Sequence, residues 1–90
     1  MKSYRFSKKY DKAYAKRIGH NVKLDAKIEQ QLALFVAGQR DYPLKDHALT
    51  GKLEGKRAFS ITGDIRVIYI ETAEAIIFID IGTHNQVHGE

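Results

Sequence analysis

The segment from Ala75 to Ile81 constrains the fold most, because Ile76 to Ile79 form an unbroken run of large apolar side chains. Such a run is far too short to span a membrane and indicates a strand that is buried on both of its faces. Two further strand-like runs, residues 56–61 and 65–70, precede it, and turn-forming residues separate the three runs. The last third of the chain therefore predicts three consecutive strands of an antiparallel sheet.

The part of the chain before these strands predicts one further strand and two helices. Alternation of polar and apolar residues from Ser3 to Phe6 indicates the strand. Apolar residues recur at helical spacing over residues 8–18 and again over residues 24–36, which indicates two consecutive helices. The residues suited to begin and end these helices are Ser7, Gly19, Asn21 and Gly38.

The resulting order, β-α-α-β-β-β, predicts an α+β fold with a mainly antiparallel sheet and a helical hairpin packed on one of its faces. With 90 residues, the chain is expected to form a single domain over residues 1–90. Residues 39–55 lack periodicity and contain Pro43, Gly51 and Gly55, so we expect an ordered loop. A loop of this length in a small domain is often functional.

Basic side chains are concentrated in the first 27 residues, which hold nine basic and two acidic side chains. The rest of the chain carries six basic and nine acidic side chains. A localised basic surface attracts polyanions, which favours a nucleic-acid partner. The N-terminal segment lacks the apolar stretch of a secretory signal, and the chain has no cysteine. We therefore expect a cytoplasmic protein without disulfides, membrane spans or Cys-based zinc sites.

Common signatures of nucleotide and metal sites are missing from the sequence, namely a Gly-rich phosphate loop, an HExxH motif and an EF-hand loop. His84 and His88 are four residues apart, a spacing that suits a metal when both lie on a helix. A helix is not expected directly after Gly82, and no third ligand is evident. We therefore predict neither a metal site nor a cofactor.

Arg66 interrupts an otherwise apolar strand. Alternation places Arg66, Ile68 and Ile70 on one face of the sheet, and we expect that face to be free of helices. Pairing of Arg66 with Glu71 or Asp80 across strands is the alternative. An accessible arginine suits a phosphodiester, because its planar fork binds two phosphate oxygens at once.

Cleavage of RNA without a metal is the reaction expected on such a surface. The 2′-OH of the RNA attacks the adjacent phosphorus, one side chain takes its proton, and another protonates the leaving 5′ oxygen. Histidine suits either step because its ordinary pKa, about 6.5, lies near working pH. Taken alone, a loop histidine such as His47 is more often a surface group, and Asp64 after a glycine is a turn residue.

Four segments of the chain together resemble one known family. They are residues 44–51 (Leu-Lys-Asp-His-Ala-Leu-Thr-Gly), 55–57 (Gly-Lys-Arg), 63–69 (Gly-Asp-Ile-Arg-Val-Ile-Tyr) and 81–84 (Ile-Gly-Thr-His). In this order and spacing, over nearly the whole chain, they resemble the YafQ-like toxins of the RelE/ParE superfamily in type II toxin–antitoxin systems. The resemblance implies a ribosome-dependent mRNA endonuclease that inhibits translation, with the ribosome, mRNA and a cognate antitoxin as partners.

Position by position, the resemblance implies which residues act. The acid and base candidates are His47, Asp64 and His84, and Arg66 is expected to contact phosphate. Further RNA or phosphate contacts are expected from Arg57, Lys52, Lys56 and His88. The basic first helix would face ribosomal RNA with Lys8, Lys9, Lys12, Lys16 and Arg17.

Three positions depart from the family pattern. Ser60 stands where YafQ-like enzymes carry another histidine, Ile65 replaces an aromatic residue, and His88 replaces a late aromatic residue expected to stack on a base. Base stacking contributes about 1–3 kcal/mol, of which a histidine can retain a part. Two other functions therefore stay open: a ParE-like toxin that binds DNA gyrase and cuts nothing, and a degenerate, non-toxic module that only binds its antitoxin.

Overall fold

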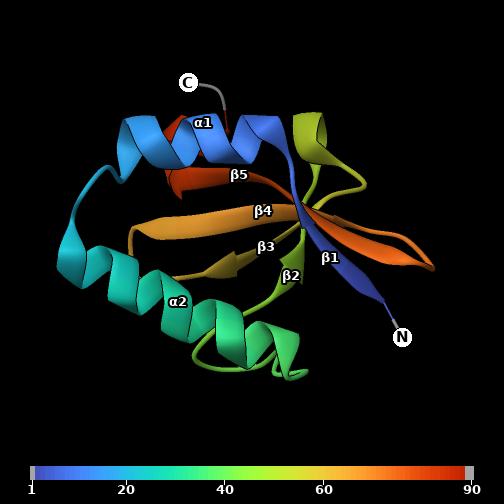
Figure 1. Ribbon diagram of the computed structural model, residues 1–90. Coiled ribbons are helices and arrows are strands. Elements are labelled where there is room, and N and C mark those ends of the chain that lie inside the picture. Colours follow the sequence, from blue (N-terminus) through green and yellow to red (C-terminus); the bar gives the residue numbers. More distant parts are fainter. Residues whose placement is uncertain (1, 89–90) are drawn as a thin grey trace.

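The computed structural model describes residues 2–88, which form a five-stranded sheet covered by two helices (Figure 1). The strands are β1 (Ser3–Phe6), β2 (His47–Ala48), β3 (Arg57–Ser60), β4 (Ile65–Glu71) and β5 (Ala75–Thr83). The helical elements are α1 (Lys8–Arg17), α2 (Val22–Val36), the short α3 (His84–Val87) and a 3₁₀ turn, η1 (Gly51–Leu53). None of the helices in this part of the chain is long and apolar enough to cross a membrane. The α+β class and the order of the expected elements are confirmed.

Both long helices begin at the predicted capping residues. The Ser7 side chain accepts a hydrogen bond from the Tyr10 backbone N–H, and the Asn21 side chain accepts one from the Leu24 N–H. Gly19 has a φ of +61°, the left-handed conformation that lets the chain leave α1 at little cost. The start of each helix is thus determined locally, before any packing against the sheet.

The order of strands in the sheet is β1-β5-β4-β3-β2, so β5 lies inside the sheet, as its apolar run predicts. β1 runs parallel to β5, and the other neighbouring strands are antiparallel. Parallel pairing needs a long connection, and the long segment between β1 and β5 in the chain provides it.

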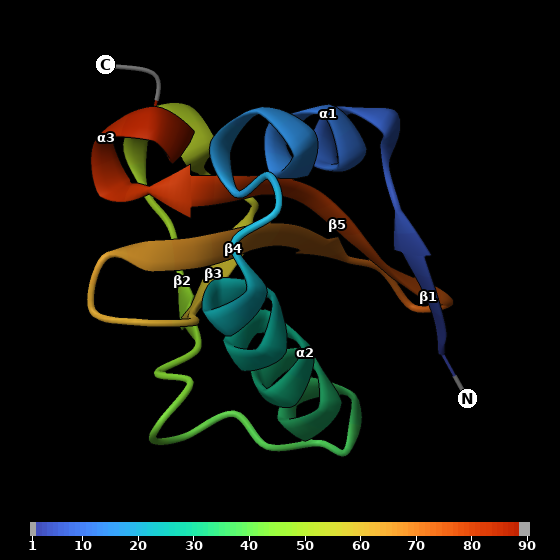
Figure 2. The ribbon, with the colours of Figure 1, turned by 60° about the vertical axis from the view of Figure 1, so that its left-hand side comes forward.

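α1 and α2 pack on the same face of the sheet (Figure 2). Residues of α2, among them Ile28 and Phe35, join Val67 and Tyr69 of β4 in the main hydrophobic cluster. The Phe35 ring lies 4.4 Å from the Phe59 ring and 4.8 Å from the Tyr69 ring, measured between centroids. Full burial of a side chain of this size stabilises the fold by about 1.5–3 kcal/mol, which explains why the apolar stripe of α2 faces the sheet.

The opposite face of the sheet, which carries Arg66, is not free as expected. Ile68 on this face is 1% exposed and joins Leu49, Ala58 and Val87 in a second hydrophobic cluster. The cover comes from α3 and from the segment around η1, both of which the sequence failed to predict. Each element has four residues or fewer, so neither is long enough to show a helical period.

Candidate functional site

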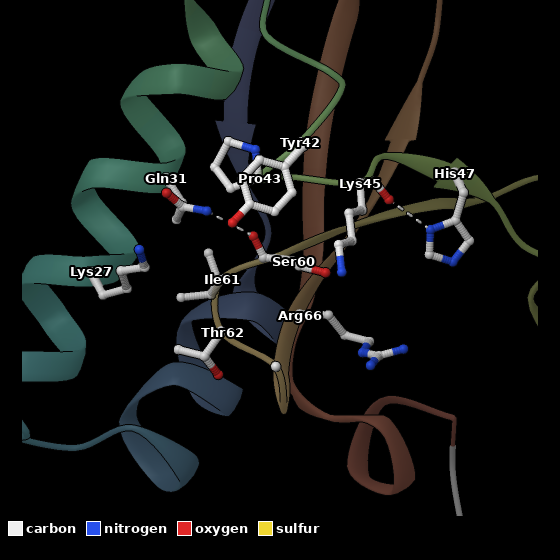
Figure 3. Close-up of a pocket in the computed structure, with 11 residues that line it drawn as sticks. Lys27, Gln31, Tyr42, Pro43, Lys45, His47, Ser60, Ile61, Thr62 and Arg66 are labelled. Carbon is white, nitrogen blue, oxygen red and sulfur yellow. Dashed lines mark hydrogen bonds between the residues drawn. The ribbon is translucent and has the colours of Figure 1, made fainter.

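A cleft of about 510 Å³ opens between α2, the segment before β2 and the turn between β3 and β4 (Figure 3). Its lining residues are Lys27, Gln31, Tyr42, Pro43, Lys45, His47, Ser60, Ile61, Thr62, Gly63 and Arg66. Three of them carry a positive charge at neutral pH and none is a carboxylate. Because cations without nearby carboxylates attract anions, the cleft is suited to a phosphate group.

Arg66 connects this cleft to the end of β5. Its Nη1 lies 3.2 Å from Nδ1 of His84. The antiparallel register explains the contact, since Arg66 lies directly opposite Gly82, two residues before His84. The Nε of Arg66 is buried and has no hydrogen-bond partner within residues 2–88, so part of the donor capacity of the guanidinium is unused.

The alternative partners considered for Arg66 are paired elsewhere. The Glu71 carboxylate lies 2.7 Å from Lys2 Nζ. Asp80, which is 4% exposed, accepts a hydrogen bond from Arg17 Nη1 at 2.9 Å. A buried carboxylate needs such a partner, so this ion pair holds α1 against β5.

His84 begins α3, contrary to the expectation that no helix follows Gly82. Thr83 and Gln86 form a capping box, in which Gln86 Oε1 accepts from the Thr83 N–H at 2.8 Å and Thr83 Oγ1 accepts from the Gln86 N–H at 3.3 Å. A Cβ at position 82 would lie 2.7 Å from Gln86 Oε1 and 3.0 Å from a guanidinium nitrogen of Arg17. A larger residue here would therefore have to displace the ends of the Gln86 and Arg17 side chains, which cap α3 and pair with Asp80.

α3 also brings His88 onto His84, with ring centroids 4.1 Å apart. Burial lowers the pKa of His88, and the charges of His84, Arg66 and His47 lower it further. These three histidines and Arg66 thus share one electrostatic environment. Within residues 2–88, no group of three or more His, Cys, Asp or Glu side chains is arranged to hold a metal ion.

His47 lies in β2 rather than in a loop, because residues 47–48 pair with β3. Its side chain is exposed, and its Nδ1 lies 3.0 Å from the Lys45 carbonyl oxygen. A carbonyl oxygen only accepts hydrogen bonds, so in this contact Nδ1 carries the ring proton. The Nε2 of His47 is then left with a free lone pair.

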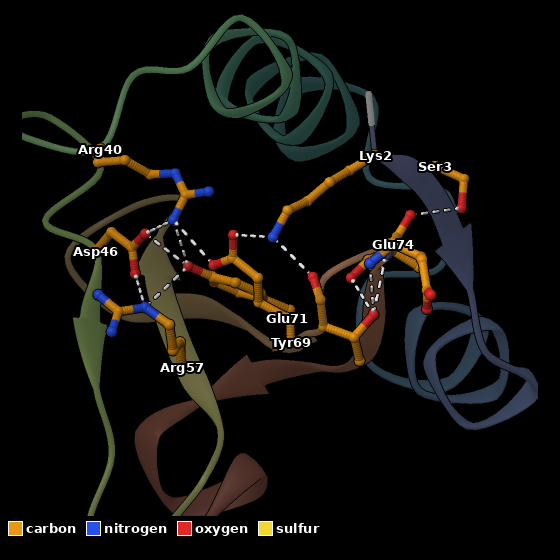
Figure 4. A network of polar contacts seen from close by, with 10 residues as sticks. Lys2, Ser3, Arg40, Asp46, Arg57, Tyr69, Glu71 and Glu74 are labelled. Atoms are coloured by element: carbon orange, nitrogen blue, oxygen red, sulfur yellow. Dashed lines mark hydrogen bonds and ion pairs between the residues drawn. The ribbon is translucent and has the colours of Figure 1, made fainter.

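Asp46 anchors the segment that carries His47, and its side chain is 1% exposed. Its carboxylate accepts hydrogen bonds from Arg40 Nη1 at 2.7 Å, Arg57 Nε at 3.2 Å and the Tyr69 hydroxyl at 2.6 Å (Figure 4). Three donors, two of them charged, offset the cost of burying a carboxylate. Sequence reasoning missed this role, because an aspartate in a segment without periodicity gives no sign of its partners.

Besides His84 and His88, four expected catalytic or RNA-contacting residues do not line the cleft: Arg57, Lys52, Lys56 and Asp64. Arg57 lies opposite Tyr69 in the register, on the face covered by α1 and α2. The structure therefore does not bring Arg57 together with Arg66. Lys52 belongs to η1, and Lys56 comes directly before β3. The Asp64 carboxylate is exposed in the turn between β3 and β4 and makes no hydrogen bond to the described chain. The roles of these four residues stay predictions.

The basic residues of α1 differ in where their side chains lie. Lys8, Lys9, Lys12 and Lys16 are exposed on α1. Arg17, in contrast, donates to buried Asp80 and to the Ile81 carbonyl oxygen at 3.0 Å. Arg17 is therefore directed into the fold, while the four lysines form the basic surface of α1.

Several cleft residues were not singled out from the sequence, namely Lys27, Gln31, Tyr42, Pro43, Thr62 and Lys45. Lys27 and Gln31 are four residues apart on α2, which places them on one face of the helix. This spacing points to a site only when it is known which face of α2 borders the cleft. Ser60 lies directly opposite Arg66 in the register and lines the cleft, so this departure from the family pattern falls inside the site.

Solved structures of bacterial toxins have the same fold. YafQ from E. coli strain BL21(DE3) is 21% identical, with a TM-score of 0.82 over 99% of this chain and 100% of that chain. YafQ in the E. coli DinJ–YafQ toxin–antitoxin complex is 24% identical, with a TM-score of 0.78 over 98% of both chains. A metal-bound toxin from Helicobacter pylori is 22% identical, with a TM-score of 0.77 over 97% of this chain and 99% of that chain.

A comparison with curated proteins gives no match. The model of one protein family, described as the bacterial toxin of type II toxin–antitoxin system, YafQ, matches residues 2–89. The match covers the four segments on which the sequence resemblance rests, and that resemblance is confirmed. The chain therefore belongs to the YafQ family of bacterial toxins from type II toxin–antitoxin systems.

Proposed function

We propose that this toxin is a ribosome-dependent mRNA endonuclease that inhibits translation in the cytoplasm. The observation that carries the proposal is the 3.2 Å contact between Arg66 and His84, beside a cleft with three cations and no carboxylate. Cleavage of RNA by its own 2′-OH needs a cation for the phosphate and groups that move two protons. That reaction requires no cofactor.

The two histidines have complementary proton positions. Nδ1 of His47 donates to the Lys45 carbonyl, so its Nε2 is free to take the proton of the 2′-OH. Nδ1 of His84 accepts from Arg66, so its ring proton lies on Nε2. Once a phosphate binds Arg66, Nδ1 can take a second proton from solvent, and the resulting imidazolium can give its Nε2 proton to the leaving 5′ oxygen. Asp64 stays the third acid or base candidate, on the family pattern alone.

In the proposed step, the 2′ oxygen forms a bond to phosphorus while the bond from phosphorus to the 5′ oxygen breaks. One histidine gains the proton of the 2′-OH, and the other donates the proton that the 5′ oxygen gains. The products are a 2′,3′-cyclic phosphate and a 5′-OH. Arg66 would stabilise the charge that develops on the phosphate oxygens.

Ser60 changes which side chains can transfer protons in the proposed reaction. Its hydroxyl lies in the cleft opposite Arg66, where a histidine is expected in YafQ-like enzymes. A serine hydroxyl does not titrate near neutral pH, so proton transfer in this chain falls to His47, His84 and the remaining candidate Asp64. The same departure favours a second candidate function, a non-toxic module that binds its antitoxin and cuts nothing.

An antitoxin is the proposed protein partner, by analogy with the E. coli DinJ–YafQ complex. Lys8, Lys9, Lys12 and Lys16 offer it a basic surface on α1, which an acidic and apolar segment would neutralise. Ribosomal RNA is the proposed partner of the same surface. Antitoxin and ribosome would therefore compete for the toxin.

Controlled expression in a bacterial host, with mRNA mapped for new 5′-OH ends, tests the proposal. We expect growth arrest and new ends within translated frames for the parent protein, and neither for His84→Ala. His20→Ala is the matched control, because His20 is exposed between α1 and α2, outside the cleft.

Each other outcome points to a different function. Growth arrest with intact mRNA and DNA damage signalling would replace the nuclease by a gyrase-binding toxin. Normal growth with the parent protein would support the non-toxic module. Full toxicity of His84→Ala would remove His84 from the proposed mechanism.

A further inference from the structure

We propose that the cleft contains a base-binding subsite in which Tyr42 stacks on an RNA base next to the phosphate held by Arg66. This inference rests on the proposed nuclease function and adds the part of the substrate that the protein recognises. It concerns Tyr42 and Gln31, neither of which takes part in the proton transfers proposed above.

Tyr42 is unusual among the aromatic residues of the chain because its side chain is 78% exposed. Tyr4 and Phe6, the other exposed aromatic residues of the described chain, are 38% and 50% exposed and lie in β1, away from the cleft. The backbone at Tyr42 is held in place, since its carbonyl accepts a hydrogen bond from Gln39 Nε2 at 3.0 Å. An aromatic side chain left exposed on a cleft gains by stacking on a planar ligand.

The rest of the cleft fits a nucleotide in which base and phosphate are held by different walls. Figure 3 shows Tyr42 and Pro43 on one side of the cleft, with Arg66 and His47 on another and Lys45 between them. A volume of about 510 Å³ lies within the range of small-molecule sites, about 300–1,000 Å³. The phosphate would lie toward Arg66 and Lys45, which leaves the space near Tyr42 for the base.

Gln31 gives the subsite a preference among bases. It lines the cleft and is 2% exposed, and its Nε2 donates to the Ser60 carbonyl at 3.3 Å. Its Oε1 is buried without a hydrogen-bond partner within residues 2–88. A buried acceptor without a donor is costly, so an amino group that reaches it is favoured. Adenine, cytosine and guanine carry an exocyclic amino group with two hydrogens for such a bond, whereas uracil has only its single ring N3–H.

Stacking on Tyr42 can be observed directly, because the chain contains no tryptophan. In Tyr42→Trp, a 2′-O-methyl RNA oligonucleotide, which lacks the attacking hydroxyl, should quench the single tryptophan. In Tyr4→Trp, with the reporter in β1 at the other edge of the sheet from β2, the same oligonucleotide should leave the fluorescence unchanged. Equal responses of the two variants would overturn the subsite.

Affinity for the same oligonucleotides gives the second test. We expect Tyr42→Ala to weaken binding about 5- to 150-fold, the range that corresponds to one stacked base, and Tyr42→Phe to retain it. Oligouridylate should bind more weakly than oligoadenylate to the parent protein, and Gln31→Leu should reduce that difference. Unchanged binding by Tyr42→Ala would disprove the subsite.

Comparison of the parent protein with Tyr42→Ala distinguishes failure of the subsite from failure of the proposed nuclease function. If the parent creates 5′-OH ends in cells, and Tyr42→Ala creates them at the same positions and rate, the subsite is wrong and the nuclease stands. If the parent neither cuts mRNA nor binds the oligonucleotides, both proposals fail.

Discussion

Nη1 of Arg66 and Nδ1 of His84 lie 3.2 Å apart, across the antiparallel pair of β4 and β5. A guanidinium has no acceptor, so the histidine nitrogen accepts this bond and its ring proton lies on Nε2. A phosphate bound by Arg66 competes for the same donor and frees Nδ1 of His84. Substrate binding and the protonation of His84 are thereby connected through a single side chain.

The first prediction concerns the shape of the Arg66 side chain. Arg66→Lys keeps the positive charge but loses the planar fork and the bond to His84. We expect kcat/KM for cleavage on ribosomes to fall roughly 10- to 150-fold, which corresponds to a charged hydrogen bond of about 1.5–3 kcal/mol. The rate at which 5′-OH ends appear measures this effect, and Arg5→Lys in exposed β1 should match the parent. A parent-like rate in Arg66→Lys would show that only its charge matters.

The second prediction concerns Asp46 as a positioning residue for His47. Asp46→Asn retains the shape but loses the charge that pairs with Arg40 and Arg57, so one donor is left without an acceptor. We expect the free energy of unfolding to fall by about 1–3 kcal/mol, measured by urea titration. At a temperature where the variant stays folded, kcat should fall while KM for the ribosome–mRNA complex is retained.

Tyr69→Phe is the comparison for that prediction. It removes only one hydroxyl donor to Asp46 and should cost about 0.5–1.5 kcal/mol with little change in kcat. Equal losses of kcat in the two variants would indicate general loosening of the fold instead of a displaced His47.

The third prediction concerns the basic surface of α1. Lys12→Gln combined with Lys16→Gln should weaken binding to purified ribosomes and leave stability unchanged, because both lysines are exposed. Each lost phosphate contact reduces the slope of log affinity against log salt by about 0.7–0.9, so the pair should reduce it by roughly 1.5. Lys23→Gln on α2 should change the slope less. Arg17→Gln should instead destabilise the fold, because it leaves Asp80 buried without its closest cation.

The fourth prediction concerns pH and His88. Its pKa in the folded protein lies below the ordinary value of 6.5, so the unfolded chain binds the proton more readily in the window below pH 6.5. The contribution of neutral His88 to stability is therefore fully present above pH 6.5 and is lost as the pH falls toward its folded-state pKa. The melting temperature should drop less on acidification in His88→Gln than in the parent, whereas His20→Gln should behave like the parent. Identical pH profiles for all three proteins would contradict this assignment.

The features that were predicted correctly from the sequence depend on residues that are close together in the chain. Ser7 and Asn21 begin their helices because a side-chain oxygen can satisfy a backbone N–H two or three residues away, whatever the rest of the fold does. The alternation that placed Arg66 and Ile68 on one face of β4 is equally local. β2 was missed because His47 and Ala48 become a strand only by pairing with β3, which no pattern within two residues can reveal.

The sequence by itself determined the identity and order of the long elements, the position of the basic charge and the family to which the chain belongs. Periodicity, capping residues and motifs each involve residues that are close together in the chain, so they can be recognised from the sequence alone. Only the tertiary structure decided that Arg66 meets His84, that Arg17 is directed to Asp80 instead of solvent, and that Tyr42 shares a cleft with both Gln31 and Arg66. Those partners are far apart in the chain, and each of these side chains has several possible partners in the sequence. Burial and distance decide which partner it contacts, and both are defined only after the sheet has brought the strands together.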